Sequence, residues 1–185
     1  NFIAGDIALP EMPRLGMIAF LSGEYKQIEW YGRGPYENYW DRKESAAIGH
    51  YKSTVWEQYH PYVRAQETGN KTDVRWIALY NKSGKGIVIM GEPTIFANAQ
   101  QFDPKRITYI PKLTKRIHGG SITPEDQISL CIDYRQMGVG GDNTWGAKNH
   151  ERYNLIPRNY QYSFRILPFD AKTTDPTLNY FNKKR

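Results

Sequence analysis

The sequence predicts an all-β protein, a large antiparallel β-sandwich, and three observations point that way. Aromatic residues are abundant, with 14 Tyr, 7 Phe and 5 Trp in 185 residues, and such side chains fit the pleated surface of a sheet. Several segments alternate apolar and polar residues with a period of two, which is typical of strands with one buried face. Helical periodicity is weak throughout, and 11 prolines disfavour long helices.

The clearest alternation is the segment DVRWIALY at residues 73–80. Its period of two places Val74 on the same face as Trp76, and Ile77 on the opposite face. Turn-forming residues at 81–86 then predict a hairpin with a returning strand. The strands expected besides 73–80 are residues 14–22, 25–31, 87–91, 94–99, 128–134 and 160–167.

One domain is expected, because 185 residues suit a single core and no repeat or low-complexity linker divides them. Residues 1–13 are expected to form a leading segment, residues 14–170 the β domain, and residues 171–185 a basic tail. No apolar stretch approaches 18 residues, so no membrane-spanning helix is predicted. The single Cys131 excludes an internal disulfide bond, and its apolar neighbours predict that it packs rather than reacts.

The formal net charge of +6 raises the question of a nucleic-acid partner. The basic residues are scattered, apart from runs at residues 112–116 and 183–185. A localised basic stripe is what nucleic-acid binding requires, and a solvated face and a frayed tail explain the two runs. Nucleic acid and membrane are therefore not predicted as partners, and the cellular compartment stays open.

The first candidate functional segment is WYGRGPYENYWDR at residues 30–42. It leaves a predicted strand through glycines and a proline, which end regular pairing and project polar groups beside aromatic rings. Glu37, Asn38 and Arg42 are the candidate ligand-binding residues. The alternative is a loop held in place by an ion pair, either Asp41–Arg42 or Glu37–Arg33.

The second candidate segment is MGVGGDNTWG at residues 137–146. Its glycines permit positive φ and close approach of the backbone, while Asp142 and Asn143 can hydrogen-bond to neighbouring backbone groups. Trp145 follows, flanked by small or polar residues that offer little to pack against. We expect Trp145, Asp142 and Asn143 to contact a sugar; the alternative is a tryptophan that caps the open end of the sandwich. A phosphate-binding loop is disfavoured, because the glycines lack the Gly-x-x-x-x-Gly-Lys pattern.

These two segments also carry a family resemblance. The motifs RLG, WYGRGPYENY, DRK, YV, ETGN and DVRW occur in that order before MGVGGDNTW. The series, over about residues 9–169, resembles the C-terminal "small chain" domain (domain 5) of glycoside hydrolase family 2 β-galactosidases. One departure is the stretch Arg64–Glu67, where the family usually has a proline before Gln-Glu-Asn-Gly; another is Thr68, which replaces that Asn.

The resemblance implies a supersandwich fold shared with galactose mutarotase-like proteins. It also implies that the domain packs against a TIM barrel and other domains of a parent chain, where it helps to wall the sugar pocket. Trp145 matches the family's loop tryptophan, which lines the subsite for the leaving-group sugar. Glu37, Asn38 and Arg42 match a loop that borders the same pocket.

Catalytic groups are not expected in this chain. A retaining glycosidase needs two carboxyl groups about 5 Å apart, and in the family both come from the barrel. Glu37, Asp41 and Asp142 are loop acids of the kind that are usually solvated or cap turns. The parent is therefore expected to be a retaining β-galactosidase, and the 185-residue chain alone is expected to be inactive.

No cofactor or metal is expected here, since the four His residues are widely separated and lack ligand spacing. Any Mg or Na that the parent enzymes use would be bound elsewhere. Two other functions remain open beside the leading one. The chain could be an independent carbohydrate-binding module, or an aldose 1-epimerase-like enzyme, although it lacks a His and Glu paired within one segment.

Overall fold

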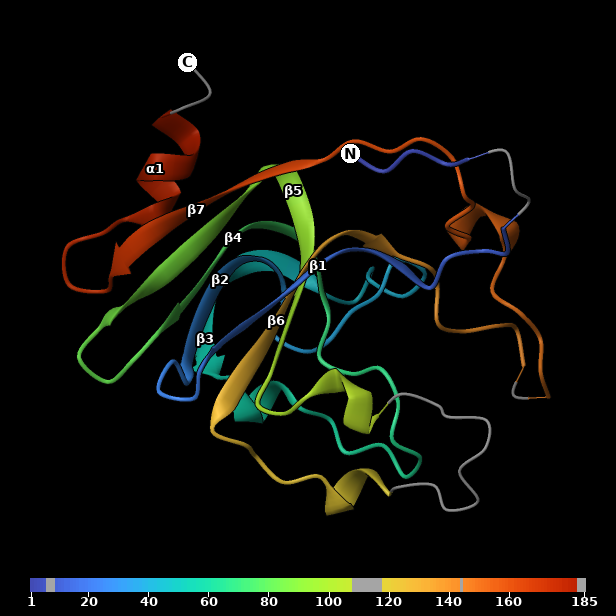
Figure 1. Ribbon diagram of the computed structural model, residues 1–185, viewed down its shortest axis with the longest axis horizontal. Coiled ribbons are helices and arrows are strands. Elements are labelled where there is room, and N and C mark those ends of the chain that lie inside the picture. Colours follow the sequence, from blue (N-terminus) through green and yellow to red (C-terminus); the bar gives the residue numbers. More distant parts are fainter. Residues whose placement is uncertain (6–8, 108–117, 144, 183–185) are drawn as a thin grey trace.

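The computed structural model describes residues 1–5, 9–107, 118–143 and 145–182. In these ranges the strands form one antiparallel seven-stranded sheet with the order β1-β6-β5-β4-β2-β3 (Figure 1). β7 pairs with the first half of β5, and β6 pairs with the second half. The strands are β1 Arg14–Ser22, β2 Gln27–Gly34, β3 Ala47–Thr54, β4 Lys71–Tyr80, β5 Lys85–Gln100, β6 Gln127–Gln136 and β7 Ser163–Asp170. Three-residue 3-10 turns occur at Trp56–Gln58, Pro104–Arg106, Gly119–Ser121 and Glu151–Tyr153.

The core lies on the two faces of the central strands β4 and β5. The larger apolar cluster includes Ile77, Leu79 and Ile89, all fully buried, with side chains from β2 and β6. A smaller cluster on the other face contains Trp76 and Met90 and is covered by Tyr180. Tyr180 belongs to α1 Pro176–Asn182, the one α-helix in the described residues, which lies near β7 in Figure 1.

The all-β, antiparallel prediction is confirmed, with α1 as a short addition within the predicted tail. The described residues form one seven-stranded sheet, so the predicted sandwich is not shown and stays a prediction. Two strands expected at 87–91 and 94–99 are one continuous strand, β5, which passes through Pro93. The strand β3 is an addition that the alternation pattern did not predict.

One facial assignment is wrong. Val74 packs in the larger cluster with Ile77 and Leu79, whereas Trp76 is in the smaller cluster on the other face. The pairing of β4 with β5 shifts register on both sides of Val74, and Asp73 has φ of 53°. An extra residue in one strand turns its side chains to the other face, so the period of two breaks at this bulge.

Two other predictions bear on single features. Cys131 is buried, and burial raises the pKa of its thiol to about 12, as expected for a cysteine that packs. The basic runs at 112–116 and 183–185 lie outside the described residues. No helix in the part of the chain that the structure describes is long and apolar enough to cross a membrane.

Candidate functional site

The two candidate segments follow strands that belong to the same sheet. The first leaves the end of β2 and leads to the edge strand β3, and the second leaves the end of β6. After β6 the chain runs as an extended excursion on the side of the sheet away from α1, drawn in orange in Figure 1. We call residues 35–46 the β2–β3 loop and residues 137–146 the tryptophan loop.

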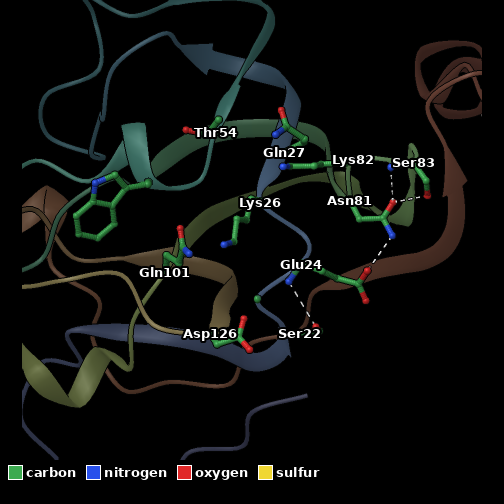
Figure 2. Close-up of a pocket in the computed structure, with 12 residues that line it drawn as sticks. Ser22, Glu24, Lys26, Gln27, Thr54, Asn81, Lys82, Ser83, Gln101 and Asp126 are labelled. Atoms are coloured by element: carbon green, nitrogen blue, oxygen red, sulfur yellow. Dashed lines mark hydrogen bonds between the residues drawn. The ribbon is translucent and has the colours of Figure 1, made fainter.

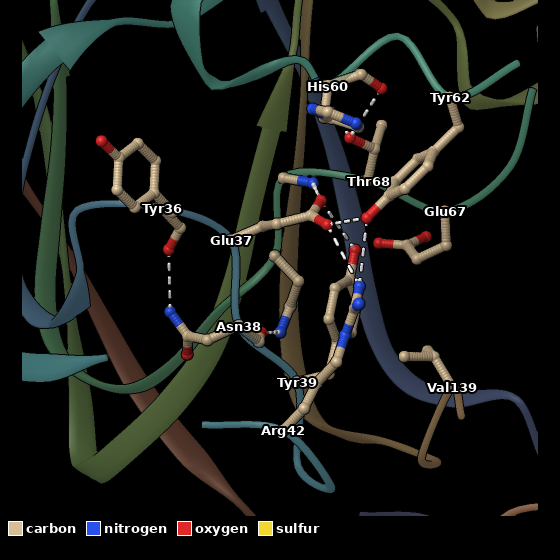
Figure 3. A network of polar contacts seen from close by, with 12 residues as sticks. Tyr36, Glu37, Asn38, Tyr39, Arg42, His60, Tyr62, Glu67, Thr68 and Val139 are labelled. Atoms are coloured by element: carbon tan, nitrogen blue, oxygen red, sulfur yellow. Dashed lines mark hydrogen bonds and ion pairs between the residues drawn. The ribbon is translucent and has the colours of Figure 1, made fainter. Parts of the chain in front are cut away.

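Glu37 is the centre of a polar network in the β2–β3 loop (Figure 3). Its carboxylate accepts hydrogen bonds from the Tyr62 hydroxyl and, at 2.7 Å, from the Gly69 backbone N–H. Arg42 forms an ion pair with it at 3.1 Å, and the Tyr39 hydroxyl donates at 3.4 Å. Only 15% of the Glu37 side chain is exposed, and its carboxylate connects the β2–β3 loop to Tyr62 and Gly69. These contacts occupy the carboxylate, so it is not available as a general acid or base.

Asn38 also has a structural position. The residue is 1% exposed, and its Oδ1 accepts from the Thr72 N–H at 2.9 Å and the Thr72 hydroxyl at 2.6 Å. Its Nδ2 donates to the Tyr36 carbonyl at 3.0 Å. The substrate contact predicted for Asn38 stays a prediction, and this geometry favours a role in fixing the loop against β4.

Arg42 keeps more access to solvent, with 53% of its side chain exposed. Besides Glu37 it donates to the Tyr62 hydroxyl at 3.1 Å and lies 4.9 Å from the centre of the Tyr39 ring. Burial lowers the pKa of Arg42, but the Tyr62 hydrogen bond and the Glu37 charge outweigh this and raise it. Arg42 is therefore a charged residue of the β2–β3 loop that a ligand can reach.

The ion pairs differ from both pairings considered for this loop. Glu37 pairs with Arg42, while Arg33 pairs with Asp73 at 2.6 Å. Asp41, which was one of the considered partners, instead bonds to the tryptophan loop: its Oδ2 accepts from the Val139 N–H at 2.9 Å and the Gly140 N–H at 2.8 Å. The structure thus connects the two candidate segments through Asp41.

In the tryptophan loop, Trp145 projects into solvent with 92% of its surface exposed. Its backbone N–H donates to Asn143 Oδ1 at 2.9 Å, so Asn143 shapes the turn that presents the ring. Asp142 Oδ1 lies 2.7 Å from His150 Nε2, and both side chains are more than half exposed. A tryptophan that caps the sheet by packing does not match this exposure.

Glu37 and Arg42 therefore form one group with Tyr62, whereas Asn38 is held by Thr72. Asp142, Asn143 and Trp145 lie together on the tryptophan loop. Sequence reasoning missed Tyr62, and it considered Asp41 only as an ion-pair partner or a solvated loop acid. Tyr62 lies 25 residues from Glu37 and Asp41 lies 98 residues from Val139, so no local pattern marks either pair. The only local signal for Asp41 was its position at the end of the glycine-rich segment.

Two cavities are relevant to ligand binding. One of about 400 Å³ borders the β2–β3 loop and is lined by Tyr36, Glu37 and His60 among others. A larger cleft of about 730 Å³ lies between the β1–β2 and β4–β5 turns and is shown in Figure 2. Lys26, Gln27, Trp56, Gln101 and Asp126 are among its lining residues. In the described ranges no three His, Cys, Asp or Glu residues are grouped to hold a metal ion.

Comparison with known proteins gives the family. The model of the family described as "Beta galactosidase small chain" matches residues 3–166, which is most of the chain. The chain belongs to the β-galactosidase small-chain family. The shared segment includes both candidate loops, since the β2–β3 loop and the tryptophan loop lie within residues 3–166.

Several curated relatives of this small-chain domain are β-galactosidases. One from Priestia megaterium is 41% identical over 167 residues, which is 90% of this chain and 16% of the relative. One from Pseudoalteromonas haloplanktis is 32% identical over 85% of this chain and 14% of the relative. β-galactosidase BgaC of Bifidobacterium adolescentis is 34% identical over 80% of this chain and 14% of the relative. The chain thus spans about one seventh of the length of the relatives that it matches.

Proposed function

We propose that this small-chain domain walls the sugar pocket of a larger β-galactosidase, where Trp145 contacts the leaving-group sugar. The observation that carries the proposal is an indole that is 92% exposed on a glycine-rich loop of a chain in this family. An aromatic ring left in solvent has a cost unless something covers it, and the apolar face of a sugar ring suits a stacking contact.

On this proposal the bond is cut by carboxylates that the 185-residue chain does not supply. In support, Glu37 is engaged by Tyr62, Arg42 and Gly69. One oxygen of Asp41 is engaged by the tryptophan loop, and the other is buried without a hydrogen-bond partner among the described residues. A retaining hydrolase needs one carboxyl group free to act as a nucleophile and another to exchange protons. The chain alone is then inactive, and its partners are a β-galactoside and the remaining domains of the larger protein.

The same proposal extends to the fold. The single sheet would be one part of a supersandwich that the rest of the larger chain completes. In support, β1 is an edge strand of the sheet and carries three exposed apolar residues, Met17, Ile18 and Phe20. An edge strand with exposed apolar side chains is normally covered by another element.

Replacing Trp145 by alanine in the complete enzyme tests the proposal. Loss of one stacking contact of about 1 kcal/mol predicts a roughly fivefold weaker binding of the leaving-group or acceptor sugar. The measurement is the partition of the galactosyl group between water and added glucose, with kcat and KM for a galactoside. Phe181→Ala is the control, because it removes an aromatic ring that is 48% exposed on α1 and lines neither cavity. Unchanged acceptor use in Trp145→Ala would exclude the proposed role.

A second candidate function is carbohydrate binding by the chain itself, and the cleft in Figure 2 favours it. The cleft holds about 730 Å³, within the usual range for small-ligand sites, and combines the Trp56 ring with Gln27, Gln101 and Asp126. Amide and carboxylate groups beside an aromatic face suit sugar hydroxyls and a sugar ring.

Titration of lactose and galactose into the 185-residue chain, followed by tryptophan fluorescence, separates the two functions. A binding module predicts a saturable signal that Trp56→Ala abolishes and Trp145→Ala leaves in place. A domain that only walls a shared pocket predicts no saturation by millimolar sugar, because most of its contacts lie on other domains.

A further inference from the structure

Asp41 joins the tryptophan loop to the β2–β3 loop through a single carboxylate oxygen. Its Oδ2 accepts two hydrogen bonds from consecutive backbone amides, those of Val139 at 2.9 Å and Gly140 at 2.8 Å. Hydrogen bonds to an ionised acceptor are shorter and stronger than those between neutral groups. Two of them on neighbouring amides fix both the position and the direction of the backbone there.

The glycines of the tryptophan loop are placed to allow this contact. A Cβ on Gly138 would lie 2.9 Å from Asp41 Oδ2, closer than a side chain tolerates, and 3.0 Å from Tyr153 Cβ, which is a tight contact. A Cβ on Gly141 would lie 2.1 Å from the Ala147 carbonyl oxygen. At Gly140 the same test gives 3.6 Å to Asp41, an ordinary contact. The close approach of the two loops thus depends on Gly138 having no side chain, while Gly141 allows the backbone to pass close to Ala147.

A second set of contacts holds the base of the anchored segment. The Gly138 N–H donates to the Tyr153 carbonyl at 2.9 Å, and the Tyr153 ring meets Trp40 edge-on at 5.9 Å between ring centres. The Arg135 guanidinium lies 4.5 Å from the centre of the Trp40 ring. Asp41 therefore binds the loop backbone directly, while Trp40 packs against Tyr153, whose carbonyl accepts from Gly138.

Trp145 itself has no such packing. It is 92% exposed, and a Cβ built on the following Gly146 would meet only open space. The location of the indole is consequently set by the backbone that leads to it. We propose that Asp41 is a positioning residue that holds the tryptophan loop so that Trp145 faces the sugar; this inference rests on the function proposed for Trp145.

The test uses the full-length protein that carries this chain, with Asp41→Asn, Trp145→Ala and the double variant. Asp41→Asn keeps the shape of the side chain but removes its charge. We expect acceptor affinity to fall several-fold in Asp41→Asn, by no more than in Trp145→Ala, while kcat for hydrolysis without acceptor is unchanged. The double variant should match Trp145→Ala, because residues that act through one contact are not additive.

Two further variants guard this experiment. Gly138→Ala retains the carboxylate but pushes the loop away from it, and should reduce acceptor affinity as Asp41→Asn does. Asp170→Asn is the control. The Asp170 carboxylate, at the end of β7, also accepts a hydrogen bond from a backbone N–H, that of Lys172 at 3.0 Å, and it forms an ion pair with Lys85. It should leave acceptor affinity unchanged.

Normal acceptor affinity in Asp41→Asn, or a loss that adds in full to that of Trp145→Ala, would overturn the positioning role. If Trp145→Ala has no effect, the proposed function fails separately. The anchor is then judged by amide hydrogen exchange in the peptide that holds Val139 and Gly140. Asp41→Asn should accelerate exchange there and Asp170→Asn should not, and equal rates would overturn the inference.

Discussion

Lys71 carries its ammonium group into the interior at the start of β4. The residue is 1% exposed; its Nζ donates to the Gly69 carbonyl at 2.9 Å and lies 5.2 Å from the centre of the Trp30 ring. Burial disfavours the charged form and lowers the pKa of Lys71 to about 7, although the Glu37 charge opposes this. The buried Lys71 amine, which interacts with the Glu37 charge, therefore titrates near neutral pH.

This amine predicts a pH dependence of stability with a definite sign. The folded chain releases the Lys71 proton near pH 7, whereas the unfolded chain keeps it until about pH 10.5. Between these values the unfolded state binds more protons, so the free energy of unfolding rises with pH, by up to about 1.4 kcal/mol per pH unit. Lys71→Met should lack this gain.

Urea unfolding of the wild-type chain and Lys71→Met at pH 7, 8 and 9 measures the difference. Other titrating groups cancel when the two are subtracted. The free energy of unfolding of the wild type should increase relative to that of Lys71→Met as the pH rises. If the difference between the two free energies is constant with pH, Lys71 does not titrate in this range.

At the scale of the element, β4 is interrupted by the bulge at Asp73. The residue has φ of 53°, and its carboxylate accepts from Arg33 at 2.6 Å and Lys43 at 2.9 Å. Burial raises the pKa of Asp73, but these hydrogen bonds outweigh it and hold the pKa below its usual value. The bulge therefore turns β4 and ties it to the β2–β3 loop at the same residue.

The bulge predicts a reversal of the usual preference for alanine over glycine in strands. Asp73→Ala and Asp73→Gly both lose the ion pairs, but a left-handed conformation costs alanine about 1 kcal/mol that glycine avoids. Asp73→Gly should therefore unfold at a higher urea concentration than Asp73→Ala. The same pair of substitutions at Lys52, in the regular part of β3, should show the opposite order. If the alanine variant is the more stable one at both positions, the bulge at Asp73 is not strained.

At the scale of the molecule, the sequence-based prediction went furthest where residues interact locally. β1 matches the expected residues 14–22, and β6 and β7 lie within a few residues of the expected segments. β3 was missed because AIGHYKST lacks an apolar face, and in the sheet this edge strand is largely exposed. The face of Val74 was wrong because a bulge leaves no signature in the alternation pattern.

In the candidate site, too, local features were predicted and long-range contacts were not. The exposure of Trp145 followed from its glycine-rich surroundings, which give an indole little to pack against. Glu37 and Asn38 were chosen as ligand contacts because polar residues on a loop beside aromatics suit that role. Some of their structural partners are local, but Tyr62 for Glu37 and Thr72 for Asn38 lie 25 and 34 residues away, beyond the reach of a local pattern.

The sequence by itself determined an antiparallel β chain, two glycine-bearing loops and a tryptophan without packing partners. These features depend on residue type and short spacing, which act before any long-range contact forms. Only the tertiary structure decided that Asp41 holds the tryptophan loop and that Glu37 holds Tyr62 and Arg42. Such contacts arise when the folded sheet brings the loops after β2 and β6 together, because the sheet sets the distance between residues that the chain separates.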